Sequence, residues 1–170
     1  MHRLFPNPPK PTFSVTRDLD MSFAYKPQSC PHQLALERRA DQQFLAMLDA
    51  YRDTGGLARK AEVLTHFQTR GGPDEDLLDS WIFRRKVICF QWQSQDWLPW
   101  FQFNSFTLEP HPQLKLLFDE LADVHEPLEM AEWFAEPNSW LAGRAPVDTL
   151  LSDLTAVVHA ARAERFIALG

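Results

Sequence analysis

The sequence predicts a mainly α-helical protein that carries one β-hairpin near the middle of the chain. Apolar residues recur every three or four positions through most of the sequence, as in amphipathic helices, and they alternate with polar residues in one stretch, 87–103. A content of 45% hydrophobic and 24% charged residues is typical of a folded chain with its own core. We therefore expect three parts: an arm (1–32), a helical lobe with the hairpin (33–111) and a small helical C-terminal domain (112–170).

The first 32 residues predict an arm rather than a packed element. Six prolines fall in this stretch, and each fixes φ and removes a backbone donor. The net charge is +3 over residues 1–40, −2 over residues 41–103 and −7 over residues 104–170. Short alternating runs around Phe13 and Phe23 favour extended pieces that lie against the main body or a neighbouring subunit.

Three short helices are expected between the arm and the hairpin. The first covers residues 33–51 and ends before the Gly55–Gly56 pair, and the second covers residues 57–67. The third runs over residues 74–86. Its first residues are acidic and its last are basic, which places each charge where the helix dipole favours it.

The hairpin is expected because the apolar period changes to two. Ile88, Phe90 and Trp92 share one face of the first strand, and a second aromatic run follows a turn at Gln93–Asp96. Pro99 is expected at an unpaired edge, since proline cannot donate to a ladder. Three helices followed by a two-stranded ribbon are the element order of a winged helix-turn-helix.

The last third predicts three more helices. The first covers residues 114–124 and is ended by Pro127, and the second covers residues 128–134. The last begins at Pro146, a favoured first-turn residue, and its apolar stripe continues to Ala161 over about four turns.

Residues that support catalysis or cofactor binding form no recognisable motif. The six glycines contain no phosphate-binding loop and the six histidines no metal-binding spacing. Cys89 is expected to be a buried structural thiol, because its apolar neighbours raise a thiol pKa. Adjacent carboxylates such as Asp119 and Glu120 are expected on solvated helix faces. We therefore expect neither an enzyme nor a cofactor.

The C-terminal third contains a turn-rich motif between two expected helices. Proline and asparagine end one helix, a glycine permits a tight turn, and a second proline starts a leucine-rich helix. The motif residues are Trp133, Pro137, Asn138, Leu141, Gly143, Arg144 and Pro146. This pattern resembles the toxin-binding domain of Xre/MbcA/ParS-type antitoxins, and the resemblance covers about residues 112–167.

The resemblance implies a type II antitoxin, usually a homodimer, that performs no chemistry of its own. Its C-terminal domain would bind a cognate RES-type toxin, which consumes or transfers from NAD, and occlude the toxin's active site. The motif residues, together with Arg162 and Arg165 on the expected terminal helix, are the candidate toxin contacts. The acidic C-terminal part is expected to complement a basic toxin cleft.

A DNA-binding regulator is the alternative hypothesis. Its phosphate contacts would come from the second and third helices and the hairpin of residues 57–103, with operator DNA as the partner. The candidates are Arg59, Lys60, Arg84, Arg85 and Lys86. The acidic start of the third helix and a net charge of −6 oppose this hypothesis, whereas the basic arm favours it.

A standalone helical scaffold is a third, weaker interpretation. No stretch approaches the ~20 apolar residues of a membrane helix, and prolines interrupt the first residues where a signal peptide needs an apolar run. Cys30 and Cys89 form no disulfide framework. We therefore expect a cytoplasmic protein with no membrane partner.

Overall fold

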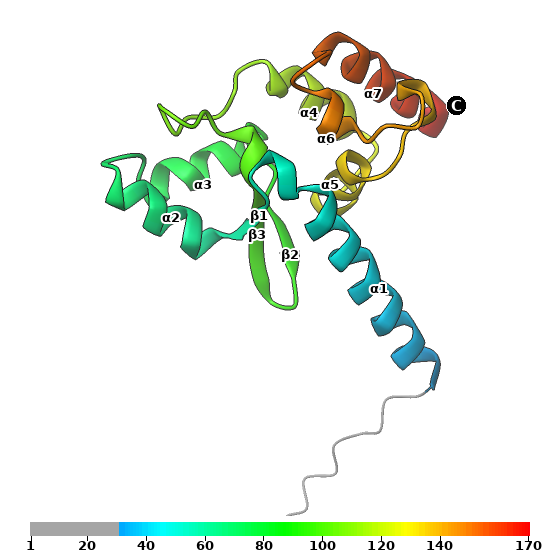
Figure 1. Ribbon diagram of the computed structural model, residues 1–170, viewed down its shortest axis with the longest axis horizontal. Coiled ribbons are helices and arrows are strands. Elements are labelled where there is room, and N and C mark those ends of the chain that lie inside the picture. Colours follow the sequence, from blue (N-terminus) through cyan, green and yellow to red (C-terminus); the bar gives the residue numbers. More distant parts are fainter. Residues whose placement is uncertain (1–30) are drawn as a thin grey trace, which may run out of the picture.

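The computed structural model describes residues 31–170, and the predicted arm with its extended pieces lies almost entirely outside this range. The described chain is mainly helical, with one small antiparallel sheet of three strands, as Figure 1 shows. The predicted fold class is confirmed at this level. None of the described helices is long and apolar enough to span a bilayer.

The sheet and three helices form the first half of the described chain. Its elements are α1 (Pro31–Ala50), the 3-10 helix η1 (Arg52–Thr54), β1 (Leu57–Arg59), α2 (Lys60–Thr69), α3 (Glu75–Phe83), β2 (Phe90–Trp92) and β3 (Gln95–Pro99). The strand order is β1-β3-β2, and both pairings are antiparallel. The hairpin is therefore joined by a strand from before α2.

β1 corrects the prediction that a helix starts at Leu57. Gly55 and Gly56 adopt φ values of 101° and 83°, which turn the backbone so that the next residues extend beside β3. Leu57 lies opposite Pro99, and the amide of Trp100 donates to the carbonyl of Gly56 at 2.9 Å. Pro99 is thus the last residue of the central strand, so the prediction that it faces an unpaired edge is wrong. A missing donor is tolerated there because the strand ends.

The hairpin turn and the start of α3 follow the sequence prediction closely. Gln93 and Ser94 have φ values of 47° and 61°, and two positive φ values are typical of a tight type I′ turn. The carboxylate of Asp74 accepts a hydrogen bond from the amide of Leu77 at 2.9 Å and caps α3. The helix ends at Phe83 rather than at Lys86, so the basic cluster follows α3 instead of forming its last turn.

The second half of the described chain is helical. Its elements are η2 (Trp100–Gln102), α4 (Leu114–Leu121), α5 (Pro127–Ala135), η3 (Ser139–Leu141), α6 (Pro146–Thr149) and α7 (Leu154–Leu169). Pro127 starts α5, and α4 already ends at Leu121, which corrects the prediction that this proline ends the preceding helix.

The predicted helix from Pro146 to Ala161 is wrong, because the chain forms α6 and α7 with a break at residues 150–153. Asp153 has non-helical backbone angles, with φ −153° and ψ 75°. Its carboxylate accepts a hydrogen bond from the amide of Ala156 at 2.9 Å and starts a new helix. The apolar stripe continues across the break and therefore hides it in the sequence.

Two hydrophobic clusters hold the described chain together. The larger one combines α1 with α4–α7 and includes Ile88, just before the hairpin, and Phe90 in β2. The smaller one lies between the sheet, α2 and α3. The hydroxyl of Tyr51 donates to the carbonyl of Ala131 at 2.8 Å and ties the end of α1 to α5. The N-terminal turns of α1 project away from the rest of the molecule (Figure 1).

Gln102 is a fully buried polar residue that connects the segment after α3 to the segment after β3. Its amide nitrogen donates to the carbonyl of Ile88 at 2.9 Å, and its amide oxygen accepts from the amide of Ile88 at 2.7 Å. The side chain thus satisfies both backbone groups of Ile88, as a neighbouring strand would.

Candidate functional site

The sequence motif of the C-terminal third folds into a closed loop between α5 and α6. The backbone of Asn138 donates to the carbonyl of Arg144 at 3.1 Å and accepts from the amide of Gly143 at 2.9 Å. The Asn138 carboxamide accepts from the amide of Trp140 at 2.9 Å. Ala142 and Gly143 both adopt positive φ, 56° and 81°, to close the loop.

Most motif residues build this loop or the core instead of facing solvent. Trp133, Leu141 and Pro146 are buried, and Trp133 lies edge-on against Phe134 with 5.1 Å between ring centroids. Asn138 is half-buried, whereas Pro137, Gly143 and Arg144 are exposed. The loop also presents a large apolar side chain to solvent, Trp140, which is 64% exposed and was not among the predicted contacts.

The end of α7 presents further apolar side chains to solvent. Phe166 is 76% exposed, Ile167 66% and Leu169 62%. η3, which carries Trp140, contacts α7 and lies near the C-terminal end of that helix in Figure 1. We call Trp140, Phe166, Ile167 and Leu169 the apolar end. A signal for it exists in the sequence, because the last turns of the amphipathic helix carry more apolar residues than one buried face needs.

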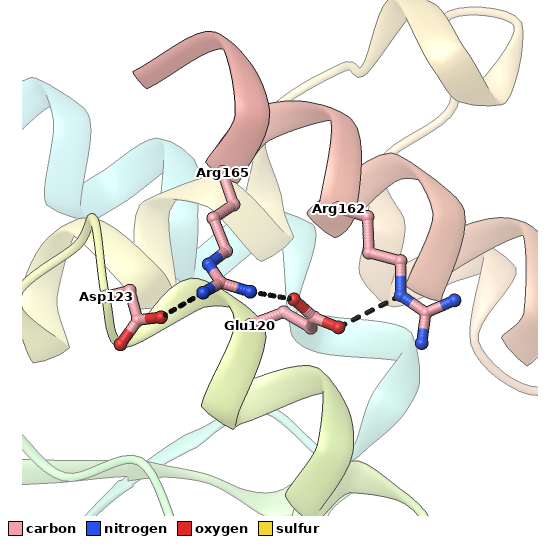
Figure 2. Close-up of polar contacts among 4 residues, drawn as sticks. All are labelled: Glu120, Asp123, Arg162 and Arg165. Carbon is pink, nitrogen blue, oxygen red and sulfur yellow. Dashed lines mark hydrogen bonds and ion pairs between the residues drawn. The ribbon is translucent and has the colours of Figure 1, made fainter. Parts of the chain in front are cut away.

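Arg162 and Arg165 do not point freely outward from α7. Figure 2 shows both guanidinium groups on the carboxylate of Glu120 in α4: Arg162 donates at 2.9 Å and Arg165 at 3.0 Å. Arg165 also pairs with Asp123 at 2.9 Å. The hydrogen bond from Arg162 and then that from Arg165 lower the pKa of Glu120, although partial burial of the carboxyl opposes the shift. The two arginines therefore fasten α7 to α4.

A row of carboxylates lines one side of α5. Glu129, Glu132 and Glu136 recur at helical spacing; Glu132 is half-buried and the other two are exposed. Burial, and then the neighbouring charges of Glu136 and Glu129, raise the pKa of Glu132. We call these residues the acidic row. It contributes to the negative charge that the sequence places in this third of the chain.

The structure divides the candidate DNA contacts into two groups, one where β1 meets α2 and the other directly after α3. Lys60 ion-pairs with Asp79 at 2.7 Å and Glu75 at 3.2 Å, and these partners, Asp79 first, raise its pKa against the effect of burial. Arg59 caps α2 and lies over the ring of Trp97 at 5.3 Å. Arg84, Arg85 and Lys86 are exposed after the last residue of α3. Only the second group forms an exposed basic cluster.

The sequence did not reveal an open cavity of about 800 Å³ between the two halves. Its walls are η1, η2 with the loop that follows it, and the connection from α6 to α7. Phe106 and Leu151 line it and are 87% and 94% exposed. The aromatic run that begins at Trp97 could have indicated this cavity. The run continues beyond β3 and supplies Trp100, Phe101 and Phe103 to the lining.

The described residues provide little for covalent or metal chemistry. Burial raises the pKa of Cys89 to about 11, with a further contribution from the charge of Asp96, so this thiol stays protonated at neutral pH. Residues 31–170 contain no group of three or more His, Cys, Asp or Glu placed to hold a metal ion. The exposed apolar and charged surfaces described above are the candidate binding features of residues 31–170.

Comparisons with known proteins identified no relative of this chain. No protein-family model matches the chain, and no significant match was found among curated proteins or solved structures. The functional argument therefore depends on the geometry above and on the resemblance of the C-terminal motif.

Proposed function

We propose that the chain is an antitoxin-like protein whose C-terminal helices bind a cognate toxin of the RES type and occlude its NAD site. The observation that carries this proposal is the apolar end. Three of its residues, Phe166, Ile167 and Leu169, are more than 60% exposed within four positions of one helix, and η3 adds Trp140 beside that helix. Clustered exposed apolar side chains on a folded protein are typical of protein-binding surfaces.

The loop motif supports the proposal as the scaffold of this surface. The hydrogen bonds around Asn138 fix η3, and the Glu120 pairs with Arg162 and Arg165 fix α7, so the apolar side chains are held on rigid elements. A preorganised surface loses less side-chain and backbone freedom on binding. In this proposal the motif residues and both arginines are positioning residues, and the apolar end makes the contact.

The acidic row suggests the charge of the partner. Its carboxylates and a net charge of −7 over residues 104–170 favour a toxin with a basic cleft. Such complementarity raises the association rate more than it raises the affinity. Salt weakens this effect because it screens the attraction between the charges. The association rate of the complex should therefore fall as ionic strength rises, and a rate independent of salt would contradict this part of the proposal.

We further propose that the protein acts as a homodimer, with α1 as the surface between copies. Residues 32–39 of α1 are exposed throughout, and three large apolar residues of the helix face solvent: Leu34 at 43%, Leu36 at 54% and Leu45 at 62%. A projecting helix gains most of its stability from packing. Sedimentation of the full chain should give a dimer that Leu34→Ser with Leu45→Ser, two positions on the same face of α1, dissociates; a wild-type monomer contradicts the proposal.

The main test is purification of the tagged full chain from its host, followed by native mass spectrometry and an NAD-hydrolysis assay of any stoichiometric partner. The proposal predicts a partner that consumes NAD alone and is inhibited when the chain is added back at a 1:1 ratio. A partner without NAD-consuming activity, or one that stays fully active in the complex, would contradict it.

DNA binding is a second candidate function, favoured by the connectivity of the first half. The order α1-β1-α2-α3-β2-β3 with sheet order β1-β3-β2 supports this candidate, because a winged helix has the same order of elements and would place α3 in the major groove. The exposed Arg84–Lys86 cluster is the available phosphate contact. Affinity for duplex DNA should fall steeply with salt, and replacing the cluster by glutamine should flatten that dependence. DNA binding that is unchanged in this variant would contradict the assignment.

A further inference from the structure

We propose that the open cavity between the two halves is the docking site of the proline-rich segment Pro6–Pro11 of the same chain. The cavity and the segment belong to different parts of the sequence, and the cavity is used by neither the proposed toxin contacts nor the proposed DNA contacts. The two match in ring content and in reach.

The cavity has the lining that proline-rich peptides select. Four aromatic side chains line it: Trp100, Phe101, Phe103 and Phe106. Aromatic-lined grooves recognise proline-rich segments because flat rings pack against pyrrolidine rings, and because a polyproline II peptide loses little entropy on binding. A groove rather than a closed pocket suits such an extended ligand, and this cavity is open to solvent and lined by the exposed Phe106 and Leu151.

The segment has the matching composition. Its sequence is Pro6-Asn7-Pro8-Pro9-Lys10-Pro11, and it contains two overlapping Pro-x-x-Pro repeats. The described cavity lining carries one carboxylate, Asp53, and one guanidinium, Arg70, so its charges balance and the match with the segment depends on the rings. The pyrrolidine rings of the segment would pack against the aromatic lining.

The segment can also reach the cavity within one molecule. α1 has 20 residues and is therefore about 30 Å long. The η1 wall of the cavity, which contains Asp53, follows directly after α1. The 19 residues between Pro11 and Pro31 span at most about 65 Å when extended. A tether of this length gives the docking step an effective concentration in the mM range, so weak contacts suffice.

Docking would cover two of the most exposed apolar side chains and bridge the two halves. Phe106 belongs to the loop after η2, which a hydrogen bond of 2.9 Å from Arg70 to the carbonyl of Ser105 fastens to α2. Leu151 belongs to the connection between α6 and α7. A segment lying between them would hold that connection against the first half of the molecule.

The test is thiol cross-linking in the full chain, in which Cys30 and Cys89 are replaced by serine. Lys10→Cys is combined with Ser105→Cys in the cavity lining, or with Gln91→Cys, an exposed position on β2 outside that lining, as the control. A short bifunctional maleimide should join the first pair within one chain about tenfold faster than the control pair, because docking raises the local concentration of one thiol near the other. Equal rates would overturn the proposal.

A second variant keeps the experiment decisive. Phe106→Ser with Leu151→Ser removes two apolar side chains from the cavity lining. Because both side chains are exposed, the circular dichroism spectrum should show that the fold is retained. The intrachain rate of the Lys10–Ser105 cysteine pair should then fall to the control rate. An unchanged rate would contradict docking in the cavity, and cross-linked dimers in place of intrachain products would show that the arm occupies a second copy instead.

Discussion

α3 is the helix proposed to contact DNA and α7 the helix proposed to contact a toxin, and the two differ in how their charges are paired. α3 begins with Asp74, Glu75 and Asp76, and Lys60 neutralises only part of this charge through Glu75 and Asp79. α7 has its arginines paired with Glu120 and ends in exposed apolar residues. A helix with free carboxylates repels phosphate, whereas an uncharged apolar helix end suits a protein partner. The contrast favours α7 as the functional helix.

The largest effect on the α3 side should come from Gln102, which holds the chain just after that helix. Gln102→Leu leaves the buried N–H and C=O of Ile88 without their partners, and we expect the free energy of unfolding to fall by about 3 kcal/mol. Urea denaturation measures this change. Gln91→Leu, at an exposed position, should change stability by less than about 0.5 kcal/mol. Equal effects of the two changes would show that Gln102 does not support this region.

A smaller loss of stability should come from removing the N-terminal caps, because α3 and α7 each begin with a capping aspartate. Asp74 and Asp153 each accept a hydrogen bond of 2.9 Å from a backbone amide of the first turn. Asp74→Ala and Asp153→Ala should each lower stability by about 1 kcal/mol. Asp76→Ala, in the first turn of α3 but not at the cap, is the matched control. A loss at one cap only would show that the two helices do not depend equally on local structure.

The smallest effect should come from Glu120, which fastens α7. Its pKa is lowered in the folded state, so its pairs stabilise the fold above the unfolded pKa near 4.3 and lose that contribution as pH falls through the lower folded pKa. Both arginines are partly exposed, so we expect less than about 1 kcal/mol. Glu120→Gln should lower stability at pH 7 and make the acid-side loss shallower, as measured by urea titrations at pH 7 and pH 3. An unchanged acid slope would contradict the assignment; Glu109→Gln is the exposed control.

Local signals predicted most of the helices correctly. The stripe of α1, the Asp74 cap of α3 and the positions of α4 and α5 depend on residues within a few turns of one another, which periodicity and capping describe. The hairpin turn at Gln93 is local in the same sense. These elements were accessible from the sequence for that reason.

The errors share a dependence on distant partners or on backbone detail. β1 forms because Leu57 pairs with Pro99, about forty residues away, and the break before α7 lies inside a continuous apolar stripe. The toxin contacts predicted at Arg162 and Arg165 stay predictions, but the sequence did not show that both residues pair with Glu120, which the packing of α7 on α4 brings near. The cavity lining likewise joins residues of both halves. Assignment of the motif to an antitoxin stays a proposal.

The measurement that tests the central claim most directly is a binding titration of the purified toxin partner with surface variants of the chain. Phe166→Ser with Leu169→Ser should weaken binding at least about 100-fold, or 2.7 kcal/mol, because two exposed anchors are removed. Phe83→Ser, at a similarly exposed apolar position at the end of α3, should leave the affinity unchanged and control for general surface hydrophobicity. Unchanged affinity of the α7 variant, with its fold retained, would contradict the claim that the apolar end is the binding surface.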